Sequence, residues 1–349
     1  MKELFILAIV AMIILVIFQI AKASEYVSVL KGEDKTRKQT NKINGFLLVA
    51  FLVFGLIGVY VCNHWFFKKT LFTQGSASVE GMAIDKMLYM TIGVTGVIFI
   101  ITQILLFWFC FRYQERDGQK ATFFAHSTKL ELLWTTVPAI FLTILVVFGL
   151  INWFKMTGAP PDGAAVVEIT GHQFGWEMRY PGKDRILGKK DYKKYNSPSG
   201  NTLGVDFDDV NSLDDLHTTE MHLVVNKPVK LVINSQDVIH DVGLNHFRMK
   251  MDAVPGIPTT LWFTPQITTA DMKVKTGNPN FVYEISCDQL CGKSHFSMRG
   301  VIVVEKQEQY NKWIAEQKPE YFTLFPNKAP KDLTDTLGKQ LAVLTPIKK

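Results

Sequence analysis

The chain has 349 residues, of which 48% are hydrophobic and 20% charged, and it carries a net charge of +6. Residues 1–155 hold 15 basic and 9 acidic residues, whereas residues 156–349 hold 23 of each, so the excess charge lies in the half with long uncharged stretches. Cations that flank apolar stretches are typical of membrane topology, whereas nucleic-acid binding requires a basic patch on a folded polar domain. Nucleic-acid binding is therefore excluded as a leading function, and four cysteines are too few for a disulfide scaffold.

Four segments lack charged residues over lengths that fit a membrane-spanning helix. At about 1.5 Å per residue, the last three would reach roughly 34 to 38 Å, which exceeds a hydrocarbon core of roughly 30 Å. Soluble helices seldom run so far without a charge, so we expect four membrane helices. The segments are Leu4–Ala21, Gly45–Phe67, Met87–Phe111 and Leu132–Phe154.

The segments between these helices differ in positive charge. Residues 22–44 carry six basic residues and residues 112–131 carry four, whereas residues 68–86 carry three. The positive-inside rule places the two richer loops in the cytoplasm, so both termini are expected on the opposite side. Ala21-Lys22-Ala23 could also serve as a signal-peptide cleavage site, but cleavage there would put the first loop outside and contradict this topology.

From about Gly158 the pattern changes to short β-rich runs separated by turns. Seven such runs without an intervening helical pattern predict a sandwich or a Greek-key barrel. After Glu305 we expect a short amphipathic helix, and from Lys318 an extended tail. The predicted strands are Val166–Thr170, Trp176–Tyr180, Met221–Val225, Val229–Ile233, Thr260–Phe263, Phe281–Ser286 and Val301–Val304.

An insert between Gly182 and His217 interrupts the strands with a basic block followed by an acidic block. A solvated loop with opposite charges is the favoured interpretation, and a docking surface is the second. The acidic block contains Asp206, Asp208, Asp209, Asp214 and Asp215.

Metal-ligating residues gather within twelve residues, at Cys287, Cys291, His295 and Met298, and His240 precedes them as a further candidate. Two thiolates, an imidazole and a thioether form a soft ligand set, which favours copper over Mg²⁺ or Ca²⁺. Mononuclear blue-copper sites use one cysteine, so the second cysteine suggests a second metal ion that shares both sulfurs. The pattern therefore predicts a copper centre suited to electron transfer.

Three other kinds of site account for part of this pattern. A structural zinc site would use both cysteines, His295 and His240, but zinc has no need of Met298. A disulfide between Cys287 and Cys291 would explain neither His295 nor Met298. A copper-delivery protein of thioredoxin fold also pairs two cysteines with a remote histidine, but its cysteines open the first helix, whereas here they follow a run of strands.

Five motifs between about Leu88 and Trp313 occur in a recognisable order: Leu130–Pro138, Gly171–Trp176, Ser235–His240, Met251–Gly256 and the cysteine stretch Cys287–Met298. Together they resemble subunit II of haem-copper cytochrome c oxidases, which bears the dinuclear copper centre CuA. The resemblance implies a hairpin of the third and fourth membrane helices, followed by a cupredoxin-like Greek-key β-sandwich outside the cytoplasmic membrane. It assigns no role to the first two helices.

The resemblance also implies roles for individual residues. Glu131 matches a carboxylate at the cytoplasmic mouth of a proton pathway into subunit I, although a helix-start charge facing the interface is an equal alternative. The implied copper ligands are the bridging thiolates of Cys287 and Cys291, the imidazoles of His240 and His295, the thioether of Met298 and the main-chain carbonyl of Gln289.

Two departures from the family pattern concern the neighbours of the copper centre. Gln289 replaces a glutamate that binds magnesium at the boundary with subunit I, which leaves that magnesium site doubtful. Phe174 replaces the tryptophan through which electrons enter, which places uptake at Phe174 or Trp176 and puts docking of an ordinary soluble cytochrome c in doubt. No Cys-x-x-Cys-His motif occurs, so no haem c is fused to the chain.

We therefore expect the electron-accepting subunit of a respiratory cytochrome c oxidase in the bacterial inner membrane, with a periplasmic copper domain. It would take electrons from a c-type cytochrome and pass them to haem in subunit I, where O₂ is reduced and protons are translocated. Expected partners are subunits I and III, membrane lipid and the cytochrome. A cytochrome held in a supercomplex with a quinol-oxidising complex is the favoured donor, and an ordinary soluble cytochrome with a shifted docking site is the alternative. The alternatives are a copper-free quinol oxidase subunit and a membrane-tethered copper-binding or copper-delivery protein.

The same reasoning predicts four domains. They are residues 1–75, an extension with two extra helices; residues 76–157, the helical hairpin; residues 158–317, the copper domain; and residues 318–349, the extended tail.

Overall fold

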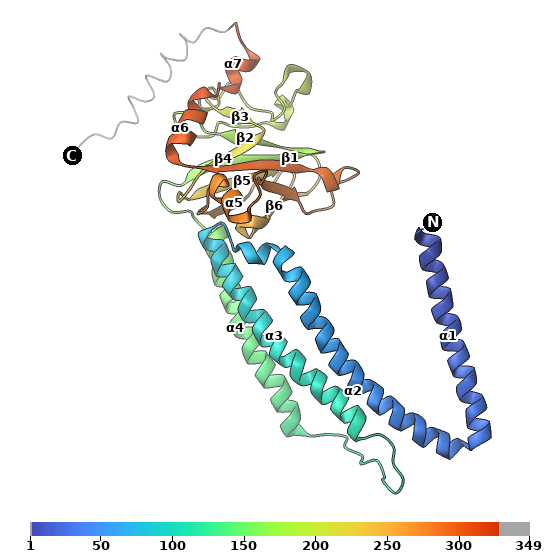
Figure 1. Cartoon of the computed structure of the whole chain (residues 1–349). Helices are drawn as coiled ribbons and strands as arrows, with labels where there is room; N and C mark the ends of the chain where they lie inside the picture. Colours follow the sequence, from blue (N-terminus) through green and yellow to red (C-terminus); the bar gives the residue numbers. More distant parts are fainter. Residues whose placement is uncertain (1, 328–349) are drawn as a thin grey trace. The chain divides into compact units, whose positions relative to one another are not determined.

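The computed structural model describes residues 2–327, except for the side chains of residues 2–8. Long helices form the N-terminal part of the chain and a β-rich domain follows (Figure 1). Contacts divide the chain into two compact units, namely Met1–Lys69 with Thr91–Pro138, and Thr70–Met90 with Ala139–Lys349.

Four helices are long and apolar enough to cross a membrane. They contain the four predicted segments, so the expected number and placement of apolar helices is confirmed. Their apolar side chains are exposed around the helix, as suits a helix whose surroundings are lipid. The helices are α1 (Lys2–Lys31), α2 (Glu33–Phe66), α3 (Val79–Arg112) and α4 (Thr128–Thr157).

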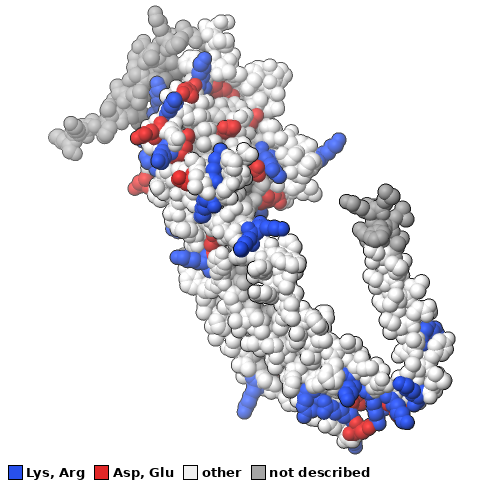
Figure 2. All heavy atoms as spheres, viewed as in Figure 1, with Lys and Arg blue, Asp and Glu red and all other residues white. Residues whose placement is uncertain are grey.

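The predicted loop at residues 22–44 is wrong, because this stretch is helical. α1 continues to Lys31 and α2 starts at Glu33, so only Gly32, with a φ of +86°, separates them. Lys, Arg, Glu and Gln favour helix, and glycine readily takes the positive φ that ends α1. Within the first unit, Lys and Arg side chains gather about this junction, while the visible surface of the helices is otherwise largely uncharged (Figure 2).

In the first unit, α2 packs against α3. Gly45 of α2 is buried, and a Cβ atom there would lie 3.1 Å from the side chain of Gln114 and 3.3 Å from the ring of Phe111. Phe46 makes an edge contact with Phe111 at 5.4 Å between ring centroids. The second helix is thus packed against the predicted hairpin.

The β-rich domain in the second unit is a sandwich of two five-stranded sheets with strand orders β3-β2-β1-β5-β8 and β4-β10-β9-β6-β7. Buried side chains such as Ile169, Leu231 and Ile285 fill the space between them. The strands are β1 (Ala165–His172), β2 (Gly175–Tyr180), β3 (Leu216–Thr218), β4 (Glu220–Val224), β5 (Val229–Ser235), β6 (His240–Leu244), β7 (Met249–Ala253), β8 (Thr259–Phe263), β9 (Tyr283–Cys287) and β10 (Arg299–Glu305).

All seven predicted strands are present, and β3, β6 and β7 were missed. β3 has only three residues, and β6 and β7 contain Asp, Gly, Lys or Ala, which disfavour strands. Short 3₁₀ helices occur at η1 (Phe67–Lys69), η2 (Leu71–Gln74), η3 (Tyr192–Lys194), η4 (Ser197–Ser199), η5 (Val210–Ser212), η6 (Asn245–Phe247) and η7 (His295–Ser297).

Three short helices complete the domain. The expected amphipathic helix is confirmed as α6 (Gln307–Glu316), and α5 (Thr269–Thr276) was missed because its sequence is short and largely polar. The prediction of an extended tail is wrong at α7 (Glu320–Leu324), where Tyr321 and Phe325 pack on Phe207 of the insert. The remainder of the predicted tail, residues 328–349, lies outside the described residues.

Candidate metal centre

The candidate ligands come together because two neighbouring strands end beside each other. His240 is the first residue of β6 and Cys287 is the last residue of β9, and these strands pair antiparallel with Val242 opposite Cys287. The following loop carries Cys291, η7 begins with His295, and Met298 lies immediately before β10. The sandwich therefore brings the five residues to one end.

Each cysteine sulfur has the other sulfur, an imidazole nitrogen and a further donor as neighbours. The two Sγ atoms are 3.6 Å apart, and both cysteines are free thiols. Cys287 Sγ lies 3.8 Å from His240 Nδ1 and 3.2 Å from the carbonyl oxygen of Gln289. Cys291 Sγ lies 3.6 Å from His295 Nδ1 and 3.8 Å from Met298 Sδ.

Most of these donors are shielded from solvent. His240, Cys287, Cys291 and Met298 are buried, and His295 is half-buried. Burial raises the pKa of the Cys291 thiol to about 11, and the adjacent Cys287 adds to the shift. A metal ion that binds here must therefore displace thiol protons, which makes its affinity depend on pH.

Two residues without a predicted role support the ligands. Asp237 Oδ1 lies 2.8 Å from His240 Nε2, and the Gln173 side chain donates to the carbonyl of Cys291 at 2.6 Å. The main-chain N–H of Gln173 donates to Asp237 at 2.7 Å, so the two supports are themselves linked. Both residues lie within motifs that the sequence displayed, but their contacts depend on the fold.

The two aromatic candidates for electron uptake have different environments. Trp176 is only 4% exposed, and its ring meets that of His240 edge-on with centroids 5.9 Å apart. A Cβ atom at Gly171 would lie 2.9 Å from Trp176 and 3.1 Å from His240, so this approach requires glycine. Phe174 is 37% exposed, and its ring would lie 3.0 Å from a Cβ atom at Gly292 in the copper loop.

Two other predicted residues lie at exposed positions. The Gln289 side chain points away from the protein interior while its carbonyl faces Cys287. Glu131 lies in the first turn of α4, in the first unit, with a half-exposed side chain 4.0 Å from His126.

Several carboxylates of the acidic block form contacts within the domain, whereas Asp208 stays exposed. Asp206 and Asp208 pair with Lys194, and Asp214 accepts a hydrogen bond from the main-chain N–H of Lys183 at 2.6 Å. Asp215 is fully buried and pairs with Arg179 at 2.8 Å. Part of the block is therefore paired within the domain, and its use as a docking surface stays a prediction.

The fold and site define a membrane-helix protein with a β-sandwich that carries a cluster of soft metal ligands. Residues 67–151 match the family of the cytochrome c oxidase subunit II transmembrane domain, and residues 165–306 match that of the cytochrome c oxidase subunit II periplasmic domain. The chain belongs to the cytochrome c oxidase subunit II family. Membership makes it a subunit of an oxidoreductase and a membrane protein with an extracellular domain, in a family whose domain implies copper binding.

Two relatives agree with this membership. The chain is 30% identical over 274 residues to the alternative cytochrome c oxidase subunit 2 of Bradyrhizobium diazoefficiens, covering 78% of this chain and 91% of that protein. It is 26% identical over 238 residues to cytochrome c oxidase subunit 2 of Cereibacter sphaeroides, and the match covers 64% of this chain and 73% of that protein. A crystal structure of the periplasmic domain of subunit II of the Bradyrhizobium japonicum cytochrome oxidase has 26% sequence identity to this chain. The match covers 44% of this chain and 94% of that one, with a TM-score of 0.30.

Proposed function

We propose that the chain is the electron-accepting subunit of a respiratory cytochrome c oxidase and holds a dinuclear copper centre of the CuA type. The observation that carries this proposal is the pair of thiols 3.6 Å apart, each with its own imidazole. The proposed ligands are Cys287, Cys291, His240, His295, Met298 and the carbonyl of Gln289.

The donor set fits two copper ions better than one zinc ion. A structural zinc site is complete with four ligands in a tetrahedron, whereas four further donor groups surround the two sulfurs here, which makes six donors in all. Thiolate, imidazole and thioether donors suit copper. When bound, the copper pair supplies a carrier for single electrons between the donor and the haem of subunit I.

The protein's own residues fix the ligands and limit access of water. Asp237 orients the imidazole of His240, Gln173 restrains the loop at Cys291, and burial excludes water from the sulfurs. We propose that electrons enter from the exposed side, through Phe174 or His295, with Trp176 beneath them against His240.

The donor is proposed to be a c-type cytochrome held beside the oxidase, in a supercomplex with a quinol-oxidising complex. A diffusing basic cytochrome is usually steered by unpaired acidic groups. In this chain Asp206 and Asp208 already pair with Lys194, and Asp215 pairs with Arg179 inside the domain. This pairing supports a donor that does not depend on long-range charge.

Other parts of the proposal concern the rest of the complex. Subunits I and III, membrane lipid and the bacterial inner membrane are the proposed surroundings, with the copper domain in the periplasm. Glu131 is proposed to lie at the mouth of a proton pathway, and Gln289 leaves the magnesium site without its usual carboxylate. The proposed domains keep the predicted boundaries at residues 75 and 157, and the copper domain extends beyond residue 317 to include α7, which packs on the insert.

Turnover of the purified oxidase complex tests this function. We expect a complex carrying Cys291→Ser to assemble with haem but to lose oxidation of c-type cytochrome, because the second sulfur is required for the copper pair. Assembly is checked by the haem absorption spectrum, and Cys110→Ser serves as the control. Cytochrome oxidation at the wild-type rate by the Cys291→Ser complex would refute the proposal.

Salt dependence of the same turnover tests the donor. With soluble cytochrome c, we expect slow oxidation that changes little when Asp206 and Asp208 are replaced by Asn. Fast oxidation that collapses with added salt, and that is lost in this double variant, would refute the tethered donor.

A further inference from the structure

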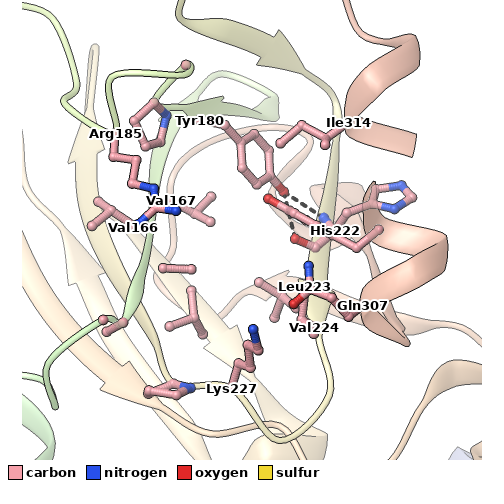
Figure 3. A pocket seen from close by; sticks show the side chains of 18 residues that line it. Val166, Val167, Tyr180, Arg185, His222, Leu223, Val224, Lys227, Gln307 and Ile314 are labelled. Carbon is pink, nitrogen blue, oxygen red and sulfur yellow. Dashed lines mark hydrogen bonds between the residues drawn. The ribbon is translucent and has the colours of Figure 1, made fainter. Parts of the chain in front are cut away.

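A cavity of about 460 Å³ lies in the sandwich away from the metal ligands. It opens between the first residues of β1 and β5 in one sheet and the edge strand β4 of the other, and α6 contributes to its wall. Val166, Val167, Leu223 and Ile314 provide apolar surface (Figure 3). Its size is within the usual range of small-molecule sites, which is roughly 300 to 1,000 Å³.

Two cations point into this cavity from separate turns. Arg185 and Lys227 are exposed to solvent, and their side chains extend toward the centre of the cavity (Figure 3). Arg185 has a φ of +63°, and Lys227 follows Asn226, whose φ is +60°. A positive φ is unfavourable for arginine, whereas asparagine adopts it readily, so only the turn at Arg185 carries strain.

The charge of the cavity is not balanced from within. No Asp or Glu is among its lining residues, and neither Arg185 nor Lys227 forms an ion pair with any side chain between residues 9 and 327. The neighbouring carboxylate of Asp184 accepts from the main-chain N–H of Ile186 at 2.8 Å instead. Two unpaired cations beside apolar walls are complementary to a ligand with an anionic head and an apolar body.

Some of the remaining polar groups of the cavity already form hydrogen bonds within the protein. The Tyr180 hydroxyl donates to the carbonyl of His222 at 3.2 Å and accepts from its N–H at 2.6 Å, so these groups pair with each other. The Oε1 atom of Gln307 is buried and has no hydrogen-bond partner in the described part of the chain. This oxygen can only accept a hydrogen bond, so a water could satisfy it but a carboxylate could not, and it does not contribute to the recognition of an anion.

We propose that this cavity binds an amphipathic carboxylate of the fatty-acid type, with the carboxylate between Arg185 and Lys227 and the acyl chain along Val167, Leu223 and Ile314. The site is remote from the metal centre. β1 runs from Ala165 at the cavity to Gly171 beside His240, which is about 20 Å at 3.3 Å per residue. Binding is therefore separate from the proposed electron transfer and leaves the copper ligands untouched.

Titration of the full chain in a non-ionic detergent with ¹³C-carboxyl-labelled decanoate tests the proposal by NMR. We expect one saturable site per chain, and we expect Arg185→Gln combined with Lys227→Gln to weaken it by about tenfold or more, because both charge-assisted contacts are lost. The control is Lys183→Gln combined with Lys189→Gln, since these exposed lysines do not line the cavity. The control should bind as the wild type does.

Further probes separate the parts of the proposal. Ala164→Phe fills the cavity without removing a charge and should also abolish the saturable site. Decanol should bind at least about tenfold more weakly than decanoate, and inorganic phosphate should not compete, because each lacks one half of the ligand. The proposal is overturned if no saturable site appears, if the Arg185 and Lys227 variant binds normally, or if decanol or phosphate matches decanoate.

Discussion

The carboxylate of Asp237 lies 2.8 Å from Nε2 of His240, and this contact leaves Nδ1 of the same ring 3.8 Å from the sulfur of Cys287. Burial opposes ionisation of Asp237, but hydrogen bonds from His240 and from the main chain outweigh it and lower the pKa of this carboxyl. An ionised Asp237 therefore fixes which nitrogen of His240 faces the sulfurs. Carboxylates in this position orient metal-binding imidazoles and increase their basicity.

Replacing Asp237 by Ala should weaken copper binding by roughly 10- to 100-fold without removing a ligand. The imidazole would lose its orienting partner, and the turn would lose acceptors for the N–H groups of Gln173 and Val238. Competition with a copper chelator measures the affinity. Asp162→Ala is the matched control, because Asp162 is an exposed carboxylate with no contact of this kind. Equal affinities in the two variants would contradict the role given to Asp237.

The helices and most strands could be predicted because their signals are local. Uncharged apolar stretches of more than twenty residues usually form membrane helices, and short apolar runs such as Val229–Ile233 are typical of buried strands. β6 and β7 were missed because their residues favour strands only when paired with each other and with β9. Residues 22–44 are helical although their charge favours a loop, because helix propensity there is high.

The composition of the candidate site was visible in the sequence, but its supporting contacts were not. Spacing brings Cys287 and Cys291 together, whereas the contact of His240 with Asp237 depends on the turn before β6. The ion pairs of the acidic block depend on where the insert folds against β2, as Arg179 and Asp215 illustrate. Tertiary contacts of this kind leave no periodic signal in a single sequence.

The buried guanidinium of Arg179 should be essential for stability. It donates to Glu168 at 2.6 Å, to Asp215 at 2.8 Å and to the carbonyl of Gly188 at 2.9 Å. Arg179→Met would leave Glu168 with Lys190 and Asn234, and Asp215 with only the main-chain N–H of Gly188. Because buried Asp215 would lose its cationic partner, we expect the free energy of unfolding of the domain to fall by about 3 to 5 kcal/mol.

Denaturant unfolding followed by the fluorescence of the full chain in detergent measures this loss. Arg299→Met is the control, because Arg299 is exposed and lies 3.5 Å from Glu284, a surface pair worth about 1 kcal/mol or less. A similar, small loss in both variants would show that the Arg179 network is not needed for stability.

His217 should make the stability of the domain depend on pH. Burial alone would lower its pKa, but contacts with Glu177 at 3.2 Å and Glu320 at 3.3 Å outweigh it and raise the pKa to about 9. Because this pKa lies above the ordinary value of 6.5, the stabilisation is complete below about pH 6.5 and is lost as the pH rises through about 9.

Comparison of the wild type with His217→Gln tests this linkage. The difference between their free energies of unfolding should be on the order of 2 to 3 kcal/mol larger at pH 6 than at pH 10. The free energies are obtained from denaturant unfolding at each pH. A difference that is the same at both pH values would contradict the assignment of a charged His217.

The topology predicted from loop charge can be tested at two exposed positions. Lys35→Cys should be protected from an impermeant maleimide in intact cells, and Thr73→Cys should react, because the positive-inside rule places position 35 in the cytoplasm. Thr73 is preferred to Ser76, which is buried. Labelling is compared with that of the wild-type chain, which lacks the introduced cysteine. Reaction of position 35 from outside would refute the topology.

The copper content and EPR spectrum of the full chain, loaded with copper in detergent, test the central claim most directly. We expect two copper ions per chain and one electron shared between them, because two sulfurs with separate imidazoles lie 3.6 Å apart. Cys287→Ser should abolish this signal, whereas Met298→Leu should keep it with an altered reduction potential, since the thioether is the weakest donor. A single copper ion with a blue-copper spectrum, or tightly bound tetrahedral zinc, would contradict the account.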